Sequence, residues 1–285
     1  MKRIRRALAL TVSAVAFTLM LIPSSAFGLS FTTIDFPGST FTGAVSINSR
    51  GQIVGGYDDA AGTGHGFLLD GGTFSTIDPP GSTGTVADGI NSRGQIVGMY
   101  MDASAATHGF LLHAGTFTTI DFPGAPYTWS ESINDAGQIV GFYTDAAGTS
   151  HGFLMDKGRF STIDVPGASS TAAFGINNRG QIVGESIDAG GAYHGFLLSD
   201  GTFTTTDPPG ATYTVAGGID NRGRIVGQFV DAGGTSHGYL LDQSTLTAID
   251  PPGSVYTAAD GINDRGQIVG FYVDAAGRNH GFLAQ

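Results

Sequence analysis

Short apolar stretches separated by turn residues fill most of the chain. In one representative segment they predict four strands, at 85–91, 95–102, 108–112 and 116–121. Asn91 opens and Gly94 closes the turn between the first two, a pattern typical of a type I turn that ends in a left-handed residue. The apolar pair Ile96-Val97 fits a central strand covered on both faces. Outside the first 28 residues no segment has a helical period, so the pattern predicts an all-β protein.

The same pattern returns every 43 residues without a shift. Three columns mark it: the glycine that opens "GQIVG" (once "GRIVG"), the histidine that opens "HGFL" (once "HGYL"), and an aspartate two residues before Pro-Gly. The repeats are 28–70, 71–113, 114–156, 157–199, 200–242 and 243–285. Repeats of this length are typical of propellers and solenoids. Four antiparallel strands per repeat match a propeller blade, so we predict a single six-bladed β-propeller domain over residues 29–285.

The last repeat predicts how the ring closes. It has three strands, 258–263, 267–274 and 280–283, and the segment 30–35 ("SFTTID") has the pattern of a fourth. We expect this N-terminal strand to pair beside 280–283 and complete the sixth blade. An open solenoid is the alternative. It needs polar capping repeats, whereas both end repeats here are ordinary.

The motifs "INSRGQIVG" and "HGFLLDGGTFSTIDPPG" resemble the HAF repeat of predicted extracellular bacterial proteins. The triplet that names that family is HGF here, or HGY at 237–239. The resemblance covers the whole chain after the leader. It implies an exported repeat protein, and it carries no established reaction or ligand.

Residues 1–28 predict a signal peptide. The basic start "MKRIRR" precedes the apolar run "ALALTVSAVAFTLMLI" and a stretch of small residues, with cleavage after Ala26 or after Gly28. An uncleaved anchor is the weaker alternative, because the apolar run is short for a membrane span. We therefore expect a secreted or extracytoplasmic protein.

Charge and composition limit the partners. Four of the 13 basic residues lie in the leader, which leaves nine against 24 acidic residues, a net charge of −15. This balance disfavours nucleic acid and anionic membranes. The absence of cysteine excludes a lipoprotein anchor and disulfides. We expect a monomer without a cofactor, whose partner is an extracellular glycan or another protein.

Six of the seven histidines occupy one repeat column. The register of the hairpin between the third and fourth strands sets each histidine opposite an aspartate, with a second aspartate such as Asp59 on its other side. The expected pairs are His65 with Asp78, His108 with Asp121, His151 with Asp164, His194 with Asp207, His237 with Asp250, and His280 with Asp35.

These pairs have a functional and a structural interpretation. They could be acid/base dyads or metal sites, or buried pairs whose carboxylate fixes the imidazole tautomer and the strand register. Six equivalent copies cannot give an acid and a base different environments, and one histidine per blade is too few for zinc. We therefore predict structural pairs and no metal.

Function is expected where the repeats differ, in the crossing loop and along the first strand. Alternate positions there should share a face near the channel mouth, and the loop after the second strand opens at the same end. The predicted ligand-binding rim is Phe41, Tyr127, Trp129, Glu131, Tyr193, Tyr213 and Tyr256. Aromatic faces and carboxylates suit a sugar, so we predict a non-enzymatic extracellular binding scaffold with carbohydrate as a candidate ligand.

The alternative is a carbohydrate-active hydrolase or lyase. Its candidate catalytic residues are Asp88, Glu131 and Asp260, with Asp88 and Glu131 performing the acid/base steps. A raised pKa on Glu131 beside Trp129 would favour the enzyme. The absence of any remodelled repeat favours the binding scaffold.

Overall fold

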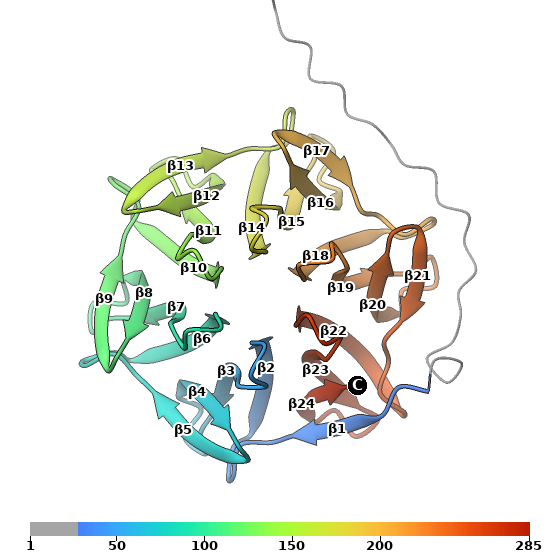
Figure 1. Ribbon diagram of the computed structural model, residues 1–285, viewed down its shortest axis with the longest axis horizontal. Coiled ribbons are helices and arrows are strands. Elements are labelled where there is room, and N and C mark those ends of the chain that lie inside the picture. Colours follow the sequence, from blue (N-terminus) through green and yellow to red (C-terminus); the bar gives the residue numbers. More distant parts are fainter. Residues whose placement is uncertain (1–27) are drawn as a thin grey trace, which may run out of the picture.

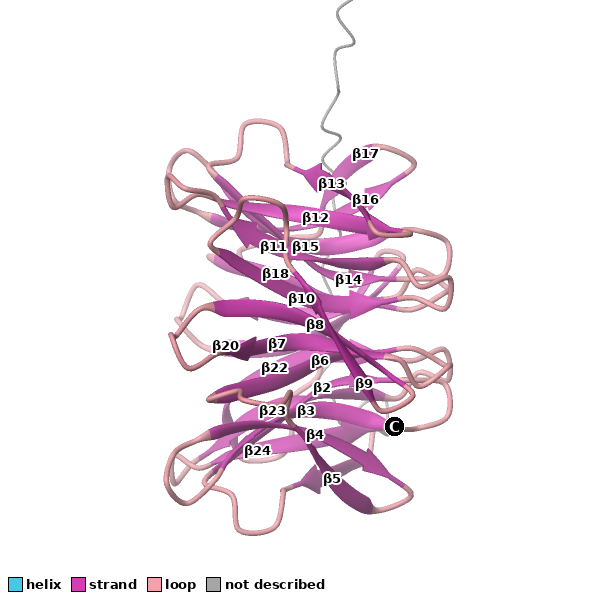
Figure 2. Ribbon diagram, turned by 90° about the vertical axis from the view of Figure 1, so that its left-hand side faces the viewer, coloured by secondary structure: helices cyan, strands magenta, loops and turns pink. Residues whose placement is uncertain are grey.

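The computed structural model describes residues 28–285, so the predicted signal peptide lies outside the described residues except for Gly28. Within this range the chain forms twenty-four strands and no helix, and hence none long and apolar enough to cross a membrane. The strands stand in sheets around a central axis, with one column of strands facing the axis and another at the periphery (Figure 1). Viewed from the side, the sheets stack beside one another around that axis (Figure 2). The fold is an all-β propeller.

Each strand column recurs with the repeat. The innermost strands are β2 (Phe41–Ile47), β6 (Gly84–Ile90), β10 (Tyr127–Ile133), β14 (Ser170–Ile176), β18 (Tyr213–Ile219) and β22 (Ser254–Ile262). The second column is β3 (Ile53–Asp58), β7 (Ile96–Met101), β11 (Ile139–Thr144), β15 (Ile182–Ile187), β19 (Ile225–Val230) and β23 (Ile268–Asp274). The third column is β4 (Gly64–Asp70), β8 (Thr107–His113), β12 (Ser150–Asp156), β16 (Tyr193–Ser199), β20 (Ser236–Asp242) and β24 (Asn279–Ala284). The outermost strands are β1 (Phe31–Ile34), β5 (Thr73–Ile77), β9 (Thr116–Ile120), β13 (Arg159–Ile163), β17 (Thr202–Thr205) and β21 (Thr245–Ala248).

The strands pair into four separate four-stranded sheets and one eight-stranded sheet. The eight-stranded sheet consists of the units β6–β9 and β10–β13, joined by one parallel pair, Tyr127 with Thr107. Neighbours within each unit are antiparallel, as the turn pattern predicts. Most of the predicted strand ends differ from the observed ones by one residue.

The predicted pairing of the N-terminal segment is present. β1 runs antiparallel to β24, with Phe31 opposite Ala284 and Ile34 opposite Gly281. The sheet order is β1-β24-β23-β22, so both ends of the described chain lie in one sheet. The outermost strand of that sheet is therefore supplied from the other end of the chain (Figure 1).

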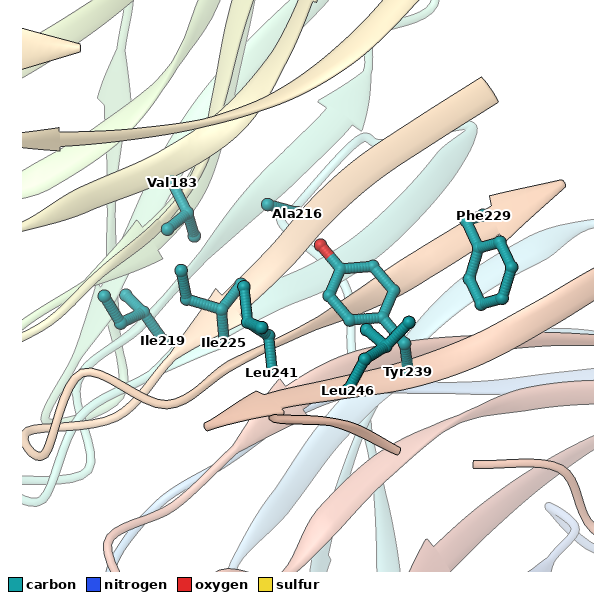
Figure 3. Close-up of a cluster of buried hydrophobic side chains, with 8 residues drawn as sticks. All are labelled: Val183, Ala216, Ile219, Ile225, Phe229, Tyr239, Leu241 and Leu246. Atoms are coloured by element: carbon teal, nitrogen blue, oxygen red, sulfur yellow. The ribbon is translucent and has the colours of Figure 1, made fainter. Parts of the chain in front are cut away.

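The hydrophobic core is divided among the contacts between neighbouring sheets. In the cluster of Figure 3, Val183 of β15 lies near Ile219 of β18 and Ile225 of β19, with Tyr239 of β20 beside them. The phenylalanine of "HGFL" is fully buried in these layers, as at Phe67 and Phe110. The last glycine of "GQIVG" is required by a close approach: a Cβ on Gly98 would lie 2.1 Å from the carbonyl oxygen of Val86.

The turn after each innermost strand also joins neighbouring units. The side-chain amide of Asn48 donates to the backbone carbonyl of Asn91 at 3.1 Å, and Asn91 donates to that of Asn134. Asn134 and Asn177 continue the chain of bonds, and Asn263 donates to Asn48 at 3.1 Å. Gly94, with φ +77°, closes its turn by donating to the carbonyl of Asn91. The turn asparagine is therefore a bridge between units as well as a turn residue.

Candidate functional site

A cavity of about 290 Å³ lies on the central axis, lined by residues of all the innermost strands. Its floor is a ring of buried isoleucines, Ile47, Ile90, Ile133, Ile176, Ile219 and Ile262. The same isoleucines line a second cavity of about 80 Å³ on the side of the asparagine turns. The apolar ring therefore separates two polar chambers, and the larger one lies on the side of the predicted rim.

The three candidate catalytic carboxylates come together in the larger cavity. Asp88 of β6, Glu131 of β10 and Asp260 of β22 all line it. They occupy the same position in their repeats, which the strand geometry turns toward the axis. No lysine, arginine or histidine is among the cavity-lining residues of the described chain. The cavity is thus acidic and has no compensating base.

Desolvation dominates the titration of these carboxyl groups. Burial raises the pKa of Asp88 to about 8, with the hydrogen bond from Trp129 lowering it and the charge of Asp260 raising it. Burial, followed by the charges of Asp88, Asp260 and Glu185, holds the pKa of Glu131 well above its usual range. Burial alone raises the pKa of Asp260 to about 7. Near neutral pH the cavity therefore holds several protons.

Trp129 connects the rim to the cavity wall. Its indole Nε1 donates to Oδ2 of Asp88 at 2.7 Å. The ring centroid lies 6.3 Å from that of Tyr127 and 5.8 Å from that of Phe142. Phe142 lies in turn 6.4 Å from Phe174, which lines the cavity. These side chains form one aromatic arc of the rim.

The remaining predicted rim residues form a second arc. Tyr193 and Tyr213 have ring centroids 5.0 Å apart, and Tyr193 is 37% exposed. Gln228 bridges the hydroxyl groups of Tyr213 and Tyr256. Phe271 then lies 5.5 Å from Tyr256 and 6.0 Å from Phe41. The structure therefore gathers the predicted rim into two arcs around the mouth.

One column of this site was missed from the sequence. The second strand contributes Met99, Phe142, Glu185, Gln228 and Phe271, each directly opposite an innermost-strand position such as Trp129. Burial raises the pKa of Glu185 to about 7. The available signal was the variation of this position among the repeats, which is as large as that of the first-strand positions.

The histidine column is found in the expected register. Each imidazole Nδ1 lies within hydrogen-bond distance of its predicted aspartate, from 2.7 Å for His194 and Asp207 to 3.1 Å for His108 and Asp121. His65 Nε2 also lies 3.6 Å from Asp59, as predicted for the second flanking carboxylate. The expectation that these pairs are buried is wrong, because the six histidine side chains are 17% to 36% exposed. They stand at the open ends of the strands, where water reaches the ring.

No group of three or more histidine, cysteine, aspartate or glutamate side chains in residues 28–285 is arranged to hold a metal ion. A separate cavity of about 300 Å³ borders the first histidine pair, His65 and Asp78, and the loop Pro79–Gly84. Another outer cavity, of about 480 Å³, lies between Arg179 and Asp200. Both are alternative locations for a ligand on the described surface.

No protein-family model matches the chain, and no curated protein has a similar sequence. Solved structures match it in fold. Aleuria aurantia lectin, in complex with Fucα1-6GlcNAc, aligns with a TM-score of 0.53 and 11% identity over 86% of this chain and 93% of the lectin. AofleA from Arthrobotrys oligospora aligns with a TM-score of 0.57 and 12% identity over 90% and 86%. TolB from Acinetobacter baumannii aligns with a TM-score of 0.58 and 14% identity, and the alignment covers 82% of this chain and 63% of TolB. The Aleuria lectin is described as a six-bladed β-propeller with a novel fucose recognition mode. At these identities the likeness establishes the propeller fold alone.

Proposed function

We propose that the protein is a non-enzymatic carbohydrate-binding β-propeller whose site is the mouth of the larger axial cavity. The observation that carries this proposal is the position of Trp129, with its ring on an aromatic arc and its N–H on the carboxyl of Asp88 in the cavity wall. Sugars bind proteins through C–H contacts with aromatic faces and hydrogen bonds to carboxyl groups, and this mouth offers both.

We further propose that the ring has six blades and is closed. Six repeats of 43 residues support this count. The eight-stranded sheet counts as two blades, because only one residue pair joins β6–β9 to β10–β13. The pairing of β1 with β24 supplies the fourth strand of the last blade. The bond from Asn263 to Asn48 supports closure, because it continues the same inter-unit contact across the ends of the chain. The likeness to a lectin described as six-bladed agrees with it.

The protein is proposed to be an exported member of the HAF-repeat family. This part rests on the leader and the repeat motifs of the sequence. It acts as a secreted or extracytoplasmic monomer, and its partner is an extracellular glycan and not nucleic acid.

The carboxylates narrow the class of glycan. The cavity has three acidic residues and no basic residue among its described lining. A sialylated or uronic ligand would therefore find no basic partner there, and it would meet like charge wherever these carboxyls ionise. Neutral glycans carry no such penalty. Among neutral sugars, the fucose ligands of the structurally similar lectins are the first to examine.

A carbohydrate-active enzyme is the second candidate, and the raised pKa of Glu131 favours it. A glycosidase needs one carboxyl protonated and a second one ionised at the same pH. In this cavity Asp88, Glu131 and Asp260 all have raised pKa values, and none is paired with a base. The arrangement therefore suits hydrogen bonding better than an acid and nucleophile pair. Hydrolysis of a bound glycan that Glu131→Gln abolishes would instead establish the enzyme.

The test is a glycan array of neutral and sialylated glycans with the wild type, Trp129→Ala and Val86→Ala. Val86 occupies the position of Trp129 in the preceding repeat and is not among the residues that line the cavity, so it is a matched truncation without an aromatic ring. We expect binding of neutral glycans that Trp129→Ala removes and Val86→Ala keeps. A folded wild-type protein that binds no glycan would overturn the proposal.

A further inference from the structure

The ring of Trp129 is held by a side chain from the neighbouring four-stranded unit. Its donor is on β10 and the accepting carboxyl of Asp88 is on β6, 2.7 Å away. Asp88 is only 5% exposed, whereas the indole remains partly accessible at the rim. Tyr127 and Phe142 pack on the ring, and its N–H donates to Asp88. The hydrogen bond therefore sets the angle of the ring.

This arrangement occurs at one boundary between repeats. Trp129 is the only tryptophan, and its position is otherwise occupied by Gly43, Val86, Ala172, Val215 and Ala258. Glu131 and Asp260 match Asp88 in their repeats, but no indole N–H stands beside them at these positions. A repeated scaffold contact would recur, so this pair is a feature of one site.

We propose that Asp88 is a positioning residue: it orients the Trp129 ring over the channel mouth, and loss or gain of its proton sets how firmly that ring is held and how tightly the mouth binds a glycan. The identity of the ligand as a glycan rests on the proposed function. The coupling between Asp88 and Trp129 does not.

The groups that face Asp88 determine where this proton titrates. Glu131 and Asp260 share its cavity, and the charge of Asp88 also acts on Tyr127 of β10. Glu185 of β15 acts on Glu131, and the lining residues of β2, β14 and β18 are not titratable. Burial raises the pKa of Asp88 to about 8, so both protonation states are populated near neutral pH. An ionised carboxyl accepts a stronger hydrogen bond from the indole than a neutral one. Rising pH should therefore fix the ring more firmly.

The single tryptophan makes the coupling measurable without any ligand. Emission of Trp129 is recorded from pH 5 to pH 10 in the wild type, Asp88→Asn and Asp260→Asn. We expect a wild-type transition with a midpoint near 8, which is absent in Asp88→Asn because an amide still accepts the bond but does not titrate. In Asp260→Asn the midpoint should move to lower pH, since a like charge is removed. A flat wild-type profile, or a transition unchanged in Asp88→Asn, would overturn the proposal.

The same variants are then titrated with α-methyl-L-fucoside as probe at pH 6 and pH 9. We expect wild-type affinity to be about tenfold weaker at pH 6, the effect of weakening one hydrogen bond to a charged group, and Asp88→Asn to show no pH dependence. Equal wild-type affinity at both pH values would refute the control of binding while leaving sugar binding intact. No binding beside a clear Asp88-dependent emission transition would refute the fucoside site and support the positioning role.

Discussion

The imidazole of His280 lies 3.0 Å from the carboxylate of Asp35, although 245 residues separate them along the chain. The contact repeats the one that His65 makes with Asp78 inside a single repeat. It exists only because β1 pairs with β24. The ends of the propeller are therefore joined by the same side-chain geometry that recurs within each unit.

If β1 is docked as firmly as the other outermost strands, Ile34→Ala should cost as much stability as Ile77→Ala. The two isoleucines occupy the same repeat position and are 5% and 6% exposed. Each truncation should lower the free energy of unfolding by about 2–4 kcal/mol. Chemical denaturation of both variants measures this. A negligible cost for Ile34→Ala beside a large one for Ile77→Ala would contradict the proposed closure of the ring through β1.

One repeat has a different pair of side chains in its turn, and this difference predicts that a double substitution restores the stability lost in a single one. Asn and Gln face each other in the other turns, as in Asn48 and Gln52, whereas Asp220 accepts a hydrogen bond from Arg224 Nε at 2.7 Å. The Asp220 side chain is fully buried, so Arg224→Met should cost about 3–5 kcal/mol by leaving a carboxylate unpaired.

The double variant Asp220→Asn/Arg224→Gln should recover most of that loss, because it restores the pair used by the other repeats. It also supplies the side-chain amide that is missing from the chain of asparagine bonds between Asn177 and Asn263. Thermal unfolding of the single and double variants measures this recovery. If the turn were sensitive to any substitution, the double variant would be no more stable than Arg224→Met.

The histidine column should make stability depend on pH. Hydrogen bonds to Asp78 and Asp207 raise the pKa of His65 and His194 above 6.5. A raised histidine pKa stabilises the fold below about pH 6.5, and that contribution is lost as the pH rises through the folded value. We expect the urea midpoint to fall between pH 6 and pH 8, and to fall less in His194→Gln. His113→Gln, outside the column, is the control and should retain the full pH dependence.

The buried cavity carboxyls should lower the free energy of unfolding at neutral pH. Burial raises the pKa of Asp260 to about 7, against about 3.9 for an unfolded aspartate. The folded state then binds more protons, so stability falls as the pH rises from about 4 to about 7. Asp260→Asn should therefore be more stable than wild type at pH 8, by on the order of 4 kcal/mol, and similar at pH 4. Asp242→Asn, at an exposed position, should change neither value; a gain there equal to that of Asp260→Asn would contradict the explanation.

The sequence predicted the strands and the register because the repeat samples every structural constraint six times. The pairing of His280 with Asp35 and the docking of 30–35 follow from that periodicity, and the structure contains both. The cavity carboxylates Asp88, Glu131 and Asp260 were also predicted to share a face, since alternate strand residues point the same way.

Three features were beyond the periodic pattern. The bond between Trp129 and Asp88 depends on a rotamer that joins two repeats, and no spacing within one repeat reveals it. The second-strand residues Phe142 and Glu185 were not predicted, because the Ile-Val pair before them is typical of a strand covered on both faces, whereas the variable position after the glycine faces the mouth. The prediction that the histidine pairs are buried was wrong, because a pair of opposite charges in a sequence does not indicate how far its side chains lie from solvent.

A crystal structure of the protein with the array's strongest glycan tests directly whether a glycan binds at the mouth beside Trp129. We expect a sugar ring on the Trp129 face, with a hydroxyl group on a cavity carboxylate. A glycan bound only in the outer cavity at His65 and Asp78, with the mouth empty, would contradict it.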